Sequence, residues 1–454
     1  MRHIPFIVLL AVGAAARAAV VTYPGPGGVA GSDQYDVKVA QAGRSRDAFV
    51  YLSKAPWRSN RSKDTSWTTF SFSGKVTVEV TKRGPAPKAC TVLPSRLGIR
   101  PVMEGNTARF TLDRPRKVSV EFDDPIPHPM LVFADPLEKN VPAPGDANVV
   151  YFGPGVHDVG LNYRIGRGKT VYLAGGAWVK GTFRADDATG TVIRGRGVLS
   201  GEQFGPKSHH LLTARSWNTR GCVVEGITLA NSPHYNLRLW GQDNVVRNVK
   251  MISWWFSTDG VATGPNSLVE NCFFKVNDDA IKLYFSGMKV RDCVIWQCEN
   301  GAPFQISWNM PTSHRGFHVK NVDIIRCEHR WKNDNCAIFC SIHGGKGHMS
   351  DYLFEDIHIE NAPWRLVNLV MKKTEFSSRQ KGYGSISNVA FRNVTVAGPM
   401  KLPNTIAGHN RDHPIRNVLF ENVRVNGRYW TDANSANLRI DPNSTSGIRF
   451  KVTR

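Results

Sequence analysis

The sequence predicts an all-β protein in which an N-terminal β-sandwich is followed by a right-handed parallel β-helix. Three observations support this fold class. Apolar residues alternate in the first 135 residues, a strand–turn repeat follows from about residue 149, and few segments have helical periodicity. A chain of 454 residues is too long for one ordinary core, which favours two structural units. The hydrophobic content of 41% supports a buried core.

The N-terminus has the features of an export signal. Arg2 and His3 precede an apolar stretch, Ile4 to Ala16, that is too short to span a bilayer. Ala16-Arg17-Ala18 offers small residues at the two positions that determine cleavage. We therefore predict a signal peptide at residues 1–18 and a secreted or periplasmic mature protein. No later stretch is apolar enough for a membrane helix, so we expect no membrane partner.

The next segment, residues 20–140, has the pattern of a small antiparallel β-sandwich. Its alternating apolar runs are separated by Gly, Pro and basic turns. The clearest runs are Phe70-Phe72, Val76-Val78-Val80, Ala108-Phe110-Leu112 and Val118-Val120-Phe122. Pro136, Pro142, Pro144 and Gly145 mark the end of this unit, and the β-helix is predicted over residues 147–454.

The second unit repeats a short apolar strand that ends in Asn or Asp. Asn248, Asn271 and Asp292 are separated by little more than twenty residues each, about one coil of a β-helix. Asn and Asp tolerate left-handed backbone geometry and can bond neighbouring amides in a ladder. Cys272 and Cys293 occupy matching places in successive repeats and are expected to stack inward. Later copies of the repeat are His318–Val322, Leu353–Ile357, Ala390–Val394 and Leu419–Val423.

Two acidic clusters carry the functional prediction. Asp259 stands in Ser257-Thr258-Asp259-Gly260, and Asp278 and Asp279 stand in Asn277-Asp278-Asp279-Ala280. Taken alone, each cluster is an ordinary turn or a calcium ligand set. On adjacent coils they lie about 4.8 Å apart along the helix axis. Like charges at that spacing raise the pKa of one carboxyl group, which suits glycoside hydrolysis.

Aromatic and polar residues surround these aspartates. Sugar faces stack on aromatic rings, and amide or ammonium groups bond sugar hydroxyls. By strand alternation, about half of the aromatic side chains should face the core. The residues expected to contact substrate are His234, Trp255, Lys282, Tyr284, Asn300, Gln305 and Trp308.

The segment Asn277 to Lys282, followed by Tyr284-Phe285-Ser286-Gly287, resembles the signature of glycoside hydrolase family 49. Val294 to Asn300 and Gln305 to Trp308 continue the resemblance, which is looser across residues 149–425 and extends distantly to the polygalacturonase family. Members are dextranases and isopullulanases, and a few act on other polysaccharides. The resemblance implies a β-sandwich followed by a right-handed β-helix. It also implies an inverting mechanism with Asp278 as general acid and with Asp259 and Asp279 activating water. The His-containing and Arg-x-Lys motifs typical of polygalacturonases are missing, which argues against galacturonate.

Together these features predict an inverting, endo-acting hydrolase of an α-glucan such as dextran, cleaving α-1,6 linkages. We expect a monomer with no metal and no cofactor. Lys and Arg are spread along the chain without a nucleic-acid motif, so no nucleic-acid partner is expected. The net charge of +21 keeps an anionic or sulfated polysaccharide open as the substrate. A polysaccharide lyase with calcium and a noncatalytic glycan-binding protein also stay open as functions of the same fold.

Overall fold

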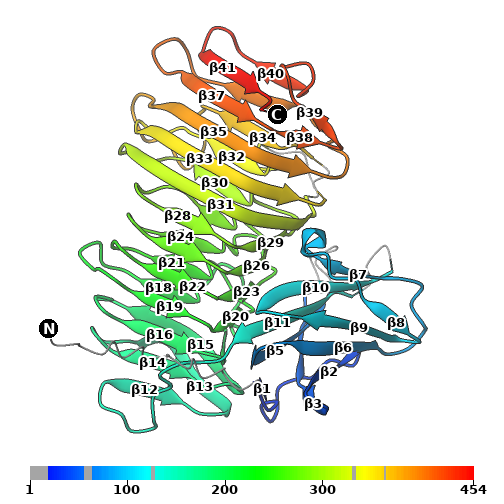
Figure 1. Cartoon of the computed structure of the whole chain (residues 1–454). Coiled ribbons are helices and arrows are strands. Elements are labelled where there is room, and N and C mark those ends of the chain that lie inside the picture. Colours follow the sequence, from blue (N-terminus) through cyan, green and yellow to red (C-terminus); the bar gives the residue numbers. More distant parts are fainter. Residues whose placement is uncertain (1–18, 56–63, 124–127, 330–333, 362–363, 454) are drawn as a thin grey trace, which may run out of the picture.

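The computed structural model describes residues 19–55, 64–123, 128–329, 334–361 and 364–453. The predicted signal peptide at residues 1–18 lies outside the described residues. Apart from one short 3-10 helix, the regular elements of the described chain are β-strands: two small sheets come first, and one long parallel sheet then coils to the C-terminus (Figure 1). The predicted fold class, a β-sandwich followed by a parallel β-helix, is confirmed. Within the described part of the chain, no helix is long and apolar enough to cross a membrane.

The β-sandwich consists of two sheets that enclose their own core. One sheet has the order β1-β5-β11-β10-β7 with β4 paired to β5, and the other has the order β3-β2-β6-β9-β8. Val37, Val78 and Phe110 from one sheet pack against Phe70 and Val118 from the other, and all five are buried. The elements are β1 (Ala19–Thr22), β2 (Tyr35–Gln41), β3 (Arg44–Ala48), β4 (Val50–Ser53), β5 (Thr65–Ser73), β6 (Val76–Lys82), β7 (Cys90–Leu93), the 3-10 helix η1 (Ser95–Leu97), β8 (Val102–Glu104), β9 (Thr107–Leu112), β10 (Arg116–Phe122) and β11 (Met130–Pro136).

The β-helix begins at Val149, and nearly all of its strands pair in parallel with the strand one coil later. Its first strands are β12 (Val149–Phe152), β13 (Gly155–Arg164), β14 (Thr170–Leu173), β15 (Ala177–Ala185), β16 (Val192–Gly195), β17 (Val198–Ser200), β18 (Leu212–Ala214), β19 (Val223–Glu225), β20 (Thr228–Ala230), β21 (Leu237–Leu239), β22 (Val245–Arg247), β23 (Lys250–Ile252), β24 (Val261–Thr263), β25 (Leu268–Glu270), β26 (Phe273–Val276), β27 (Ile281–Lys282), β28 (Lys289–Arg291), β29 (Val294–Gln297) and β30 (Phe304–Ser307). Longer strands and loops follow: β31 (His314–Cys327), β32 (Phe339–Ile342), β33 (His348–Ile359), β34 (Val367–Val370), β35 (Ser385–Val396), β36 (Asn404–Ala407), β37 (Ile415–Glu421), β38 (Arg424–Val425), β39 (Arg428–Tyr429), β40 (Leu438–Ile440) and β41 (Thr445–Lys451).

Successive coils place these strands in three stacks. The first stack passes through β16, β19, β22, β25 and β28, and the second through β17, β20, β23, β26 and β29. The third stack passes through β18, β21, β24, β27, β30 and β32. The turn that leads from the second stack to the third is long and variable in sequence, whereas the turn from the first to the second is short.

The short turn explains the repeated Asn and Asp residues. Asn248, Asn271, Asp292 and Asn321 have φ angles of 54°, 51°, 58° and 54°, in the left-handed region. Asn and Asp enter that region at lower cost than other residues with a Cβ atom. Neighbouring members of the row also bond one another, as Asn271 Nδ2 does to Asn248 Oδ1 at 3.4 Å. These turns keep one coil in register with the next.

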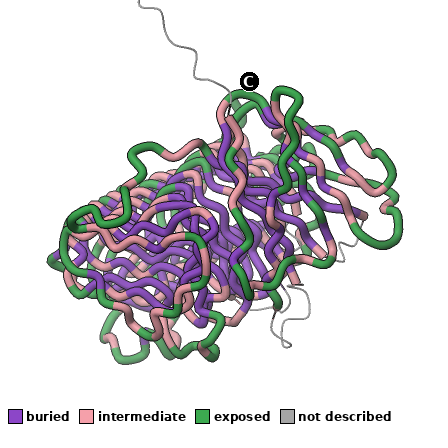
Figure 2. The backbone as a smooth tube through the Cα atoms, turned by 90° about the horizontal axis from the view of Figure 1, so that it is seen from below, coloured by how far each residue is buried: buried purple, intermediate pink, exposed green. Residues whose placement is uncertain are grey.

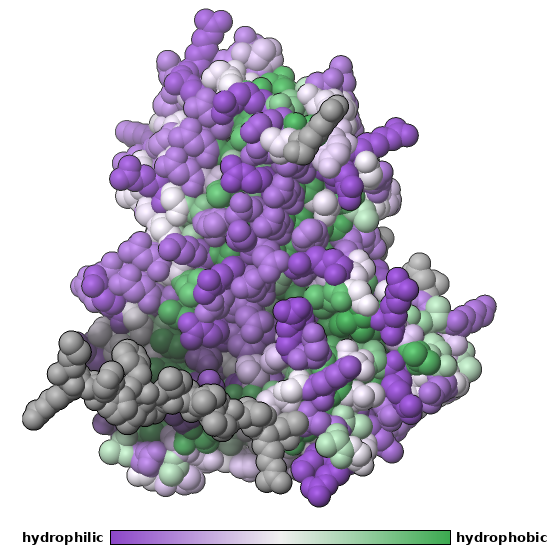
Figure 3. Space-filling model, in the orientation of Figure 1, coloured by the Kyte–Doolittle hydropathy of each residue, from purple (hydrophilic) through white to green (hydrophobic). Residues whose placement is uncertain are grey.

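The inside of the β-helix is filled with apolar side chains from all three stacks. Leu237, Val261, Ile281 and Phe304 succeed one another in the third stack and are fully buried. Cys272 and Cys293 are buried in the same core, as their matching places in the repeat predicted. Cys340 is a free thiol whose Sγ donates to the carbonyl of Asp334 at 3.2 Å. Buried residues fill the middle of the coils and exposed residues follow their rim (Figure 2). Hydrophilic side chains cover much of the face seen in Figure 3.

The sandwich packs against the outer face of the second stack. Trp67 and Phe133 of the sandwich contact an apolar cluster that includes Trp178, Trp254 and Phe273 of the β-helix. The Phe133 and Phe273 rings are 5.1 Å apart. Trp254 and Trp296 are thus buried in the interface with the sandwich, on the outer face of the β-helix, and not in its core, where strand alternation placed about half of the aromatic residues near the aspartates.

Buried charges add specific contacts to this interface. Asp135 at the end of β11 accepts a hydrogen bond from Lys250 Nζ at 2.8 Å, and Arg196 Nε lies 3.6 Å away. Burial alone would raise the pKa of Asp135, but Lys250, Arg196 and Lys117 outweigh burial and hold the pKa below its usual range. Arg326 and Glu121 form a second pair across the interface at 2.5 Å. These pairs fix how the two units meet.

Replacing Asp135 by Ala should strongly destabilise the protein. The change leaves Lys250 and Arg196 buried without their carboxylate, which costs about 3–5 kcal/mol. Urea-induced unfolding followed by tryptophan fluorescence measures the effect. Asp36→Ala is the control, because the Asp36–Arg83 pair has side chains that are 52% exposed and should contribute about 1 kcal/mol or less. Equal unfolding midpoints for the two variants would contradict the importance of the buried pair.

Candidate active site

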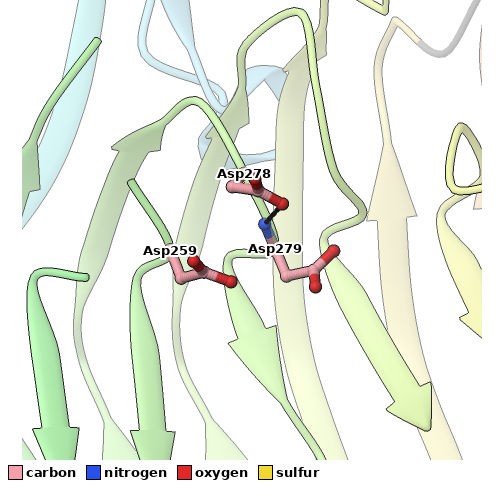
Figure 4. Close-up of side chains that lie close together, drawn as sticks. All are labelled: Asp259, Asp278 and Asp279. Atoms are coloured by element: carbon pink, nitrogen blue, oxygen red, sulfur yellow. Dashed lines mark hydrogen bonds between the residues drawn. The ribbon is translucent and has the colours of Figure 1, made fainter. Parts of the chain in front are cut away.

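The acidic residues lie in the turns that lead from the second stack to the third. Asp259 ends the turn between β23 and β24, and Asp278 and Asp279 stand in the next turn, between β26 and β27. The amide of Gly260 donates to the carbonyl of Asp279 at 3.0 Å, so the two turns are directly adjacent. One oxygen from each of the three carboxylates lies within 4.8 Å of the others (Figure 4).

A sharp backbone bend allows both Asp278 and Asp279 to reach the same space. The amide of Asp279 donates to Asp278 Oδ1 at 2.9 Å (Figure 4). Asn277 holds the bend from below, because its Nδ2 donates to the carbonyl of Trp254 at 2.6 Å. Gly301, with a φ of 82°, passes so close that an added Cβ would lie 2.3 Å from the backbone carbon of Asp278. Only glycine fits beneath this pair.

Lys282 bridges two of the three carboxylates. Its Nζ lies 2.6 Å from Asp259 Oδ1 and 2.5 Å from Asp279 Oδ2. Asp279 Oδ1 accepts further hydrogen bonds from the amide of Ala302 and from Asn335 Nδ2, both at 3.1 Å. Both oxygens of Asp279 are therefore engaged, whereas in the described structure Asp259 is held at Oδ1 alone.

The electrostatics differ among these groups. Burial raises the pKa of Asp278 to about 6, and the nearby charge of Asp279 adds to the rise. Burial also raises the pKa of Asp259, while the ammonium of Lys282 opposes that rise. For Lys282 burial disfavours the charge, but Asp259 and Asp279 outweigh it and raise the pKa, so the ammonium persists. Asp278 is the carboxyl group that Lys282 does not touch, and it carries a proton in mildly acidic solution.

These groups open into a cavity of about 410 Å³. Besides the three aspartates, it is lined by five of the predicted contact residues, His234, Lys282, Tyr284, Asn300 and Trp308. Asn300 Nδ2 donates to Asp278 Oδ2 at 2.9 Å and so orients the carboxyl group. Lys282 was expected to bond a sugar hydroxyl. Its ammonium lies between the carboxylates of Asp259 and Asp279 and bonds both of them.

Two predicted contact residues lie elsewhere. Gln305 is fully buried beneath the cavity, where its Nε2 donates to Asn335 Oδ1 at 2.6 Å. It therefore supports a residue of the cavity wall. Trp255 lines a separate cavity of about 620 Å³ beside the sandwich, together with Trp178, Phe204 and the loop at Gly27 and Gly28. Trp255 lies near the start of the turn that ends at Asp259, close to the second-stack strand β23.

Further residues from neighbouring turns and loops belong to the wall. Tyr235 follows His234 in the turn one coil before Asp259. Asn335 and Phe376 come from long loops further along the chain, and the Phe376 ring meets Trp308 edge-on at 5.4 Å. Neither loop follows the coil repeat, so the repeat gave no signal for these two residues.

The three carboxylates also form a donor set that could hold a divalent cation. The ammonium of Lys282, however, lies against both Asp259 and Asp279 and supplies positive charge at that point. A cation bound there would have to displace Lys282 or share its oxygens. The arrangement is better suited to acid–base chemistry, because burial raises the pKa of Asp278 and of Asp259 while Lys282 holds Asp259 and Asp279 in place.

Comparisons with known proteins agree with this architecture. No protein-family model matches the chain. The chain is 27% identical over 420 residues to a dextranase from Arthrobacter globiformis, covering 68% of this chain and 66% of that protein, so it spans just under two thirds of that relative's length. It is 24% identical over 461 residues to an isopullulanase from Aspergillus niger, covering 82% of this chain and 79% of the relative.

Among solved structures, Dex49A from Penicillium minioluteum superposes with a TM-score of 0.75 at 18% sequence identity. The match covers 95% of this chain and 96% of that structure, so the two share both the sandwich and the β-helix. The resemblance predicted from the sequence is confirmed: the chain is a homologue of dextranases and of an isopullulanase, with the fold of Dex49A.

Proposed function

We propose that this protein is an inverting, endo-acting glycoside hydrolase that cleaves an α-glucan such as dextran at α-1,6 linkages. One observation carries the proposal: three carboxyl groups with different electrostatic environments meet in a cavity on the β-helix. Relatives named dextranase and isopullulanase support the choice of an α-glucan. The protein is proposed to act as an exported monomer, since a polymeric substrate is met outside the cell.

Asp278 is assigned as the general acid. Its pKa of about 6 leaves it partly protonated near pH 6, as a general acid requires. Hydrogen bonds from the Asp279 amide and from Asn300 fix the direction of its carboxyl group. The proton passes to the glycosidic oxygen as the bond from that oxygen to the anomeric carbon breaks.

Asp259 is assigned as the proton acceptor. Water attacks the anomeric carbon and gives up one proton, and Asp259 Oδ2 is the oxygen left available by Lys282. Asp279 holds Lys282 and Asn335 in place and adds negative charge near the positive charge that develops on the sugar. The three aspartates thus take the separate roles of acid, base and electrostatic support.

Digestion of a panel of glycans tests the proposal directly. The purified mature protein is incubated with dextran, pullulan, polygalacturonate and a sulfated polysaccharide, and the products are separated by size. Mixed short oligosaccharides from dextran are expected. Monosaccharide alone would contradict endo action, and an unsaturated product would show a lyase. Products from none of the polymers would overturn the proposed function.

Asp278→Asn should lower kcat about 100- to 10,000-fold, because the amide cannot donate the proton to the leaving oxygen. The variant should unfold at nearly the wild-type temperature, since Asn has the same shape. Asp292→Asn is the matched control, because Asp292 occupies a turn position at which other coils carry Asn. Rates on dextran measure the effect, and a folded Asp278→Asn enzyme with full activity would falsify the assignment.

The pH profile gives an independent test. Asp278 must be protonated to act as the acid, so kcat/KM should fall as the pH rises through about 6. The residual activity of Asp278→Asn should lack this alkaline fall. Initial rates between pH 4 and pH 8, at about constant ionic strength, would measure it. The assignment fails if wild type and variant lose activity in parallel above pH 6.

The stereochemistry of the product is a further prediction. One oxygen of each carboxylate lies within 4.8 Å of one oxygen of each of the others, closer than the roughly 6.5–9.5 Å between the carboxyl groups of typical inverting pairs. Retention, however, would need Asp259 or Asp279 to attack the anomeric carbon, whereas Lys282 holds both residues and Asp259 Oδ2 is assigned to the proton of the attacking water. The first product from an α-glucan should therefore be the β-anomer, as seen by proton NMR before mutarotation. An α-anomer would assign a retaining mechanism.

A further inference from the structure

A column of outward-facing residues connects the catalytic cavity to the earlier coils. In the third stack, Arg184, Thr213, Arg238, Ala262 and Lys282 stand in register, one on each successive strand. Strand spacing places Arg238 roughly 10 Å from Lys282 along the helix axis. Ala262, the small residue between them, leaves room over the intervening strand.

A second cavity of about 310 Å³ lies at the far end of this column. It is lined by Arg184, Arg215 and Arg238, by the three histidines His209, His210 and His234, and by Asn162, Ser208, Thr213 and Trp240. None of these described lining residues is an aspartate or a glutamate. His234 lines the catalytic cavity as well, so the two spaces are neighbours.

The positive charge in this second cavity is largely uncompensated. Arg184 pairs with Asp186 at 2.6 Å, but within the described residues neither Arg215 nor Arg238 forms an ion pair with a carboxylate. Arg238 Nη1 donates to His210 Nε2 at 2.8 Å, so the proton of the neutral imidazole is on Nδ1. That Nδ1 and Arg238 Nε are both buried without a hydrogen-bond partner. The cavity therefore offers donors that no protein acceptor satisfies.

Aromatic residues flank the same cavity. The Arg238 guanidinium lies 4.5 Å from the ring centre of Trp240, which fixes its orientation. Trp240 stacks on Trp217 at 4.4 Å, and Phe285 meets Trp217 edge-on at 5.2 Å. Trp217 is 51% exposed and offers a flat surface on which a sugar ring can stack. An exposed aromatic surface and unpaired cationic donors thus lie next to each other.

We propose that this cavity is a subsite for an anionic group, such as a sulfate or a carboxylate, carried by the polysaccharide substrate. The inference builds on the proposed function, and it narrows the substrate to a glycan with sparse acidic substituents. Buried unpaired donors cost stability unless a ligand satisfies them, and an oxyanion satisfies guanidinium and imidazole N–H groups together. Asp259 lies one strand beyond Arg238, and Asp278 and Asp279 lie two strands beyond it. These carboxyl groups repel anions at the bond to be cleaved, so the charged group and that bond lie on different sugars.

Binding to the Asp278→Asn enzyme tests this subsite without turnover. The ligands are dextran oligosaccharides of one size that are neutral, lightly sulfated or lightly carboxymethylated, together with inorganic sulfate, and calorimetry gives each Kd. The anionic oligosaccharides should bind at least about tenfold more tightly than the neutral ones, the gain expected of a charge-assisted hydrogen bond. Inorganic sulfate alone should bind more weakly than the anionic and the neutral oligosaccharides.

Arginine variants assign the effect to this cavity. Arg238→Gln and the exposed Arg215→Gln should each remove most of the preference for anionic chains, and Arg238→Lys should keep part of it. Arg439→Gln is the matched control, because Arg439 is exposed in the same column, five strands beyond Lys282. The control should bind all ligands as the parent does.

The outcomes separate this inference from the proposed function. Equal affinity for neutral and anionic chains overturns the subsite alone, as does a preference that survives both Gln substitutions or is lost equally in Arg439→Gln. Sulfate that binds as tightly as the sulfated oligosaccharide also overturns it, by showing a site for a free anion. Failure of the wild-type enzyme to cleave any polysaccharide of the digestion panel, with the binding preference of the Asp278→Asn enzyme intact, overturns the proposed hydrolysis and leaves the subsite standing.

Discussion

The register between successive coils is the constraint on which the rest of this structure depends. The three carboxyl groups of Asp259, Asp278 and Asp279 meet because two turns, distant by about twenty residues in sequence, are brought one strand spacing apart. The hydrogen bond from Gly260 to the Asp279 carbonyl ties these turns together, and the row at Asn248, Asn271 and Asp292 maintains the same register at the other end of the second-stack strands. A slip of one residue would turn Lys282 inward and disperse the three carboxylates.

The sandwich supports the same coils from the outside. Its apolar contacts with Trp254 and Phe273 and the buried pairs of Asp135 and Glu121 lie behind the turns that hold Asp259 and Asp278. Trp254 belongs to both sets, because its ring is in the interface and its carbonyl accepts the hydrogen bond from Asn277. Trp254 thus connects the packing of the two units to the backbone bend at Asp278 and Asp279.

The parts of the structure predictable from sequence were those that follow the repeat. Asn and Asp at regular intervals indicated coils, because the left-handed turn requires such residues, and the adjacent-coil position of Asp259 and Asp278 followed from the interval. Gln305 could not be placed in this way, because whether an outward-facing residue is exposed depends on the loop that covers it. Asn335 comes from such a loop. The contact of Asp135 with Lys250 joins residues from two different folding patterns, and neither pattern specifies the partner.

The column from Arg184 to Lys282 has a consequence for how the groove can diversify. Each coil contributes one outward residue from its third-stack strand and one preceding turn, while the inward residues of the same strand maintain the core. The recognition surface is therefore divided into separate units, each encoded by a short contiguous stretch of sequence. A substitution at Arg238 alters the groove at one level along its axis, while the aspartates on the following coils belong to other strands and turns. In such a protein, substitutions on one coil can change substrate preference while the three aspartates on the other coils stay the same.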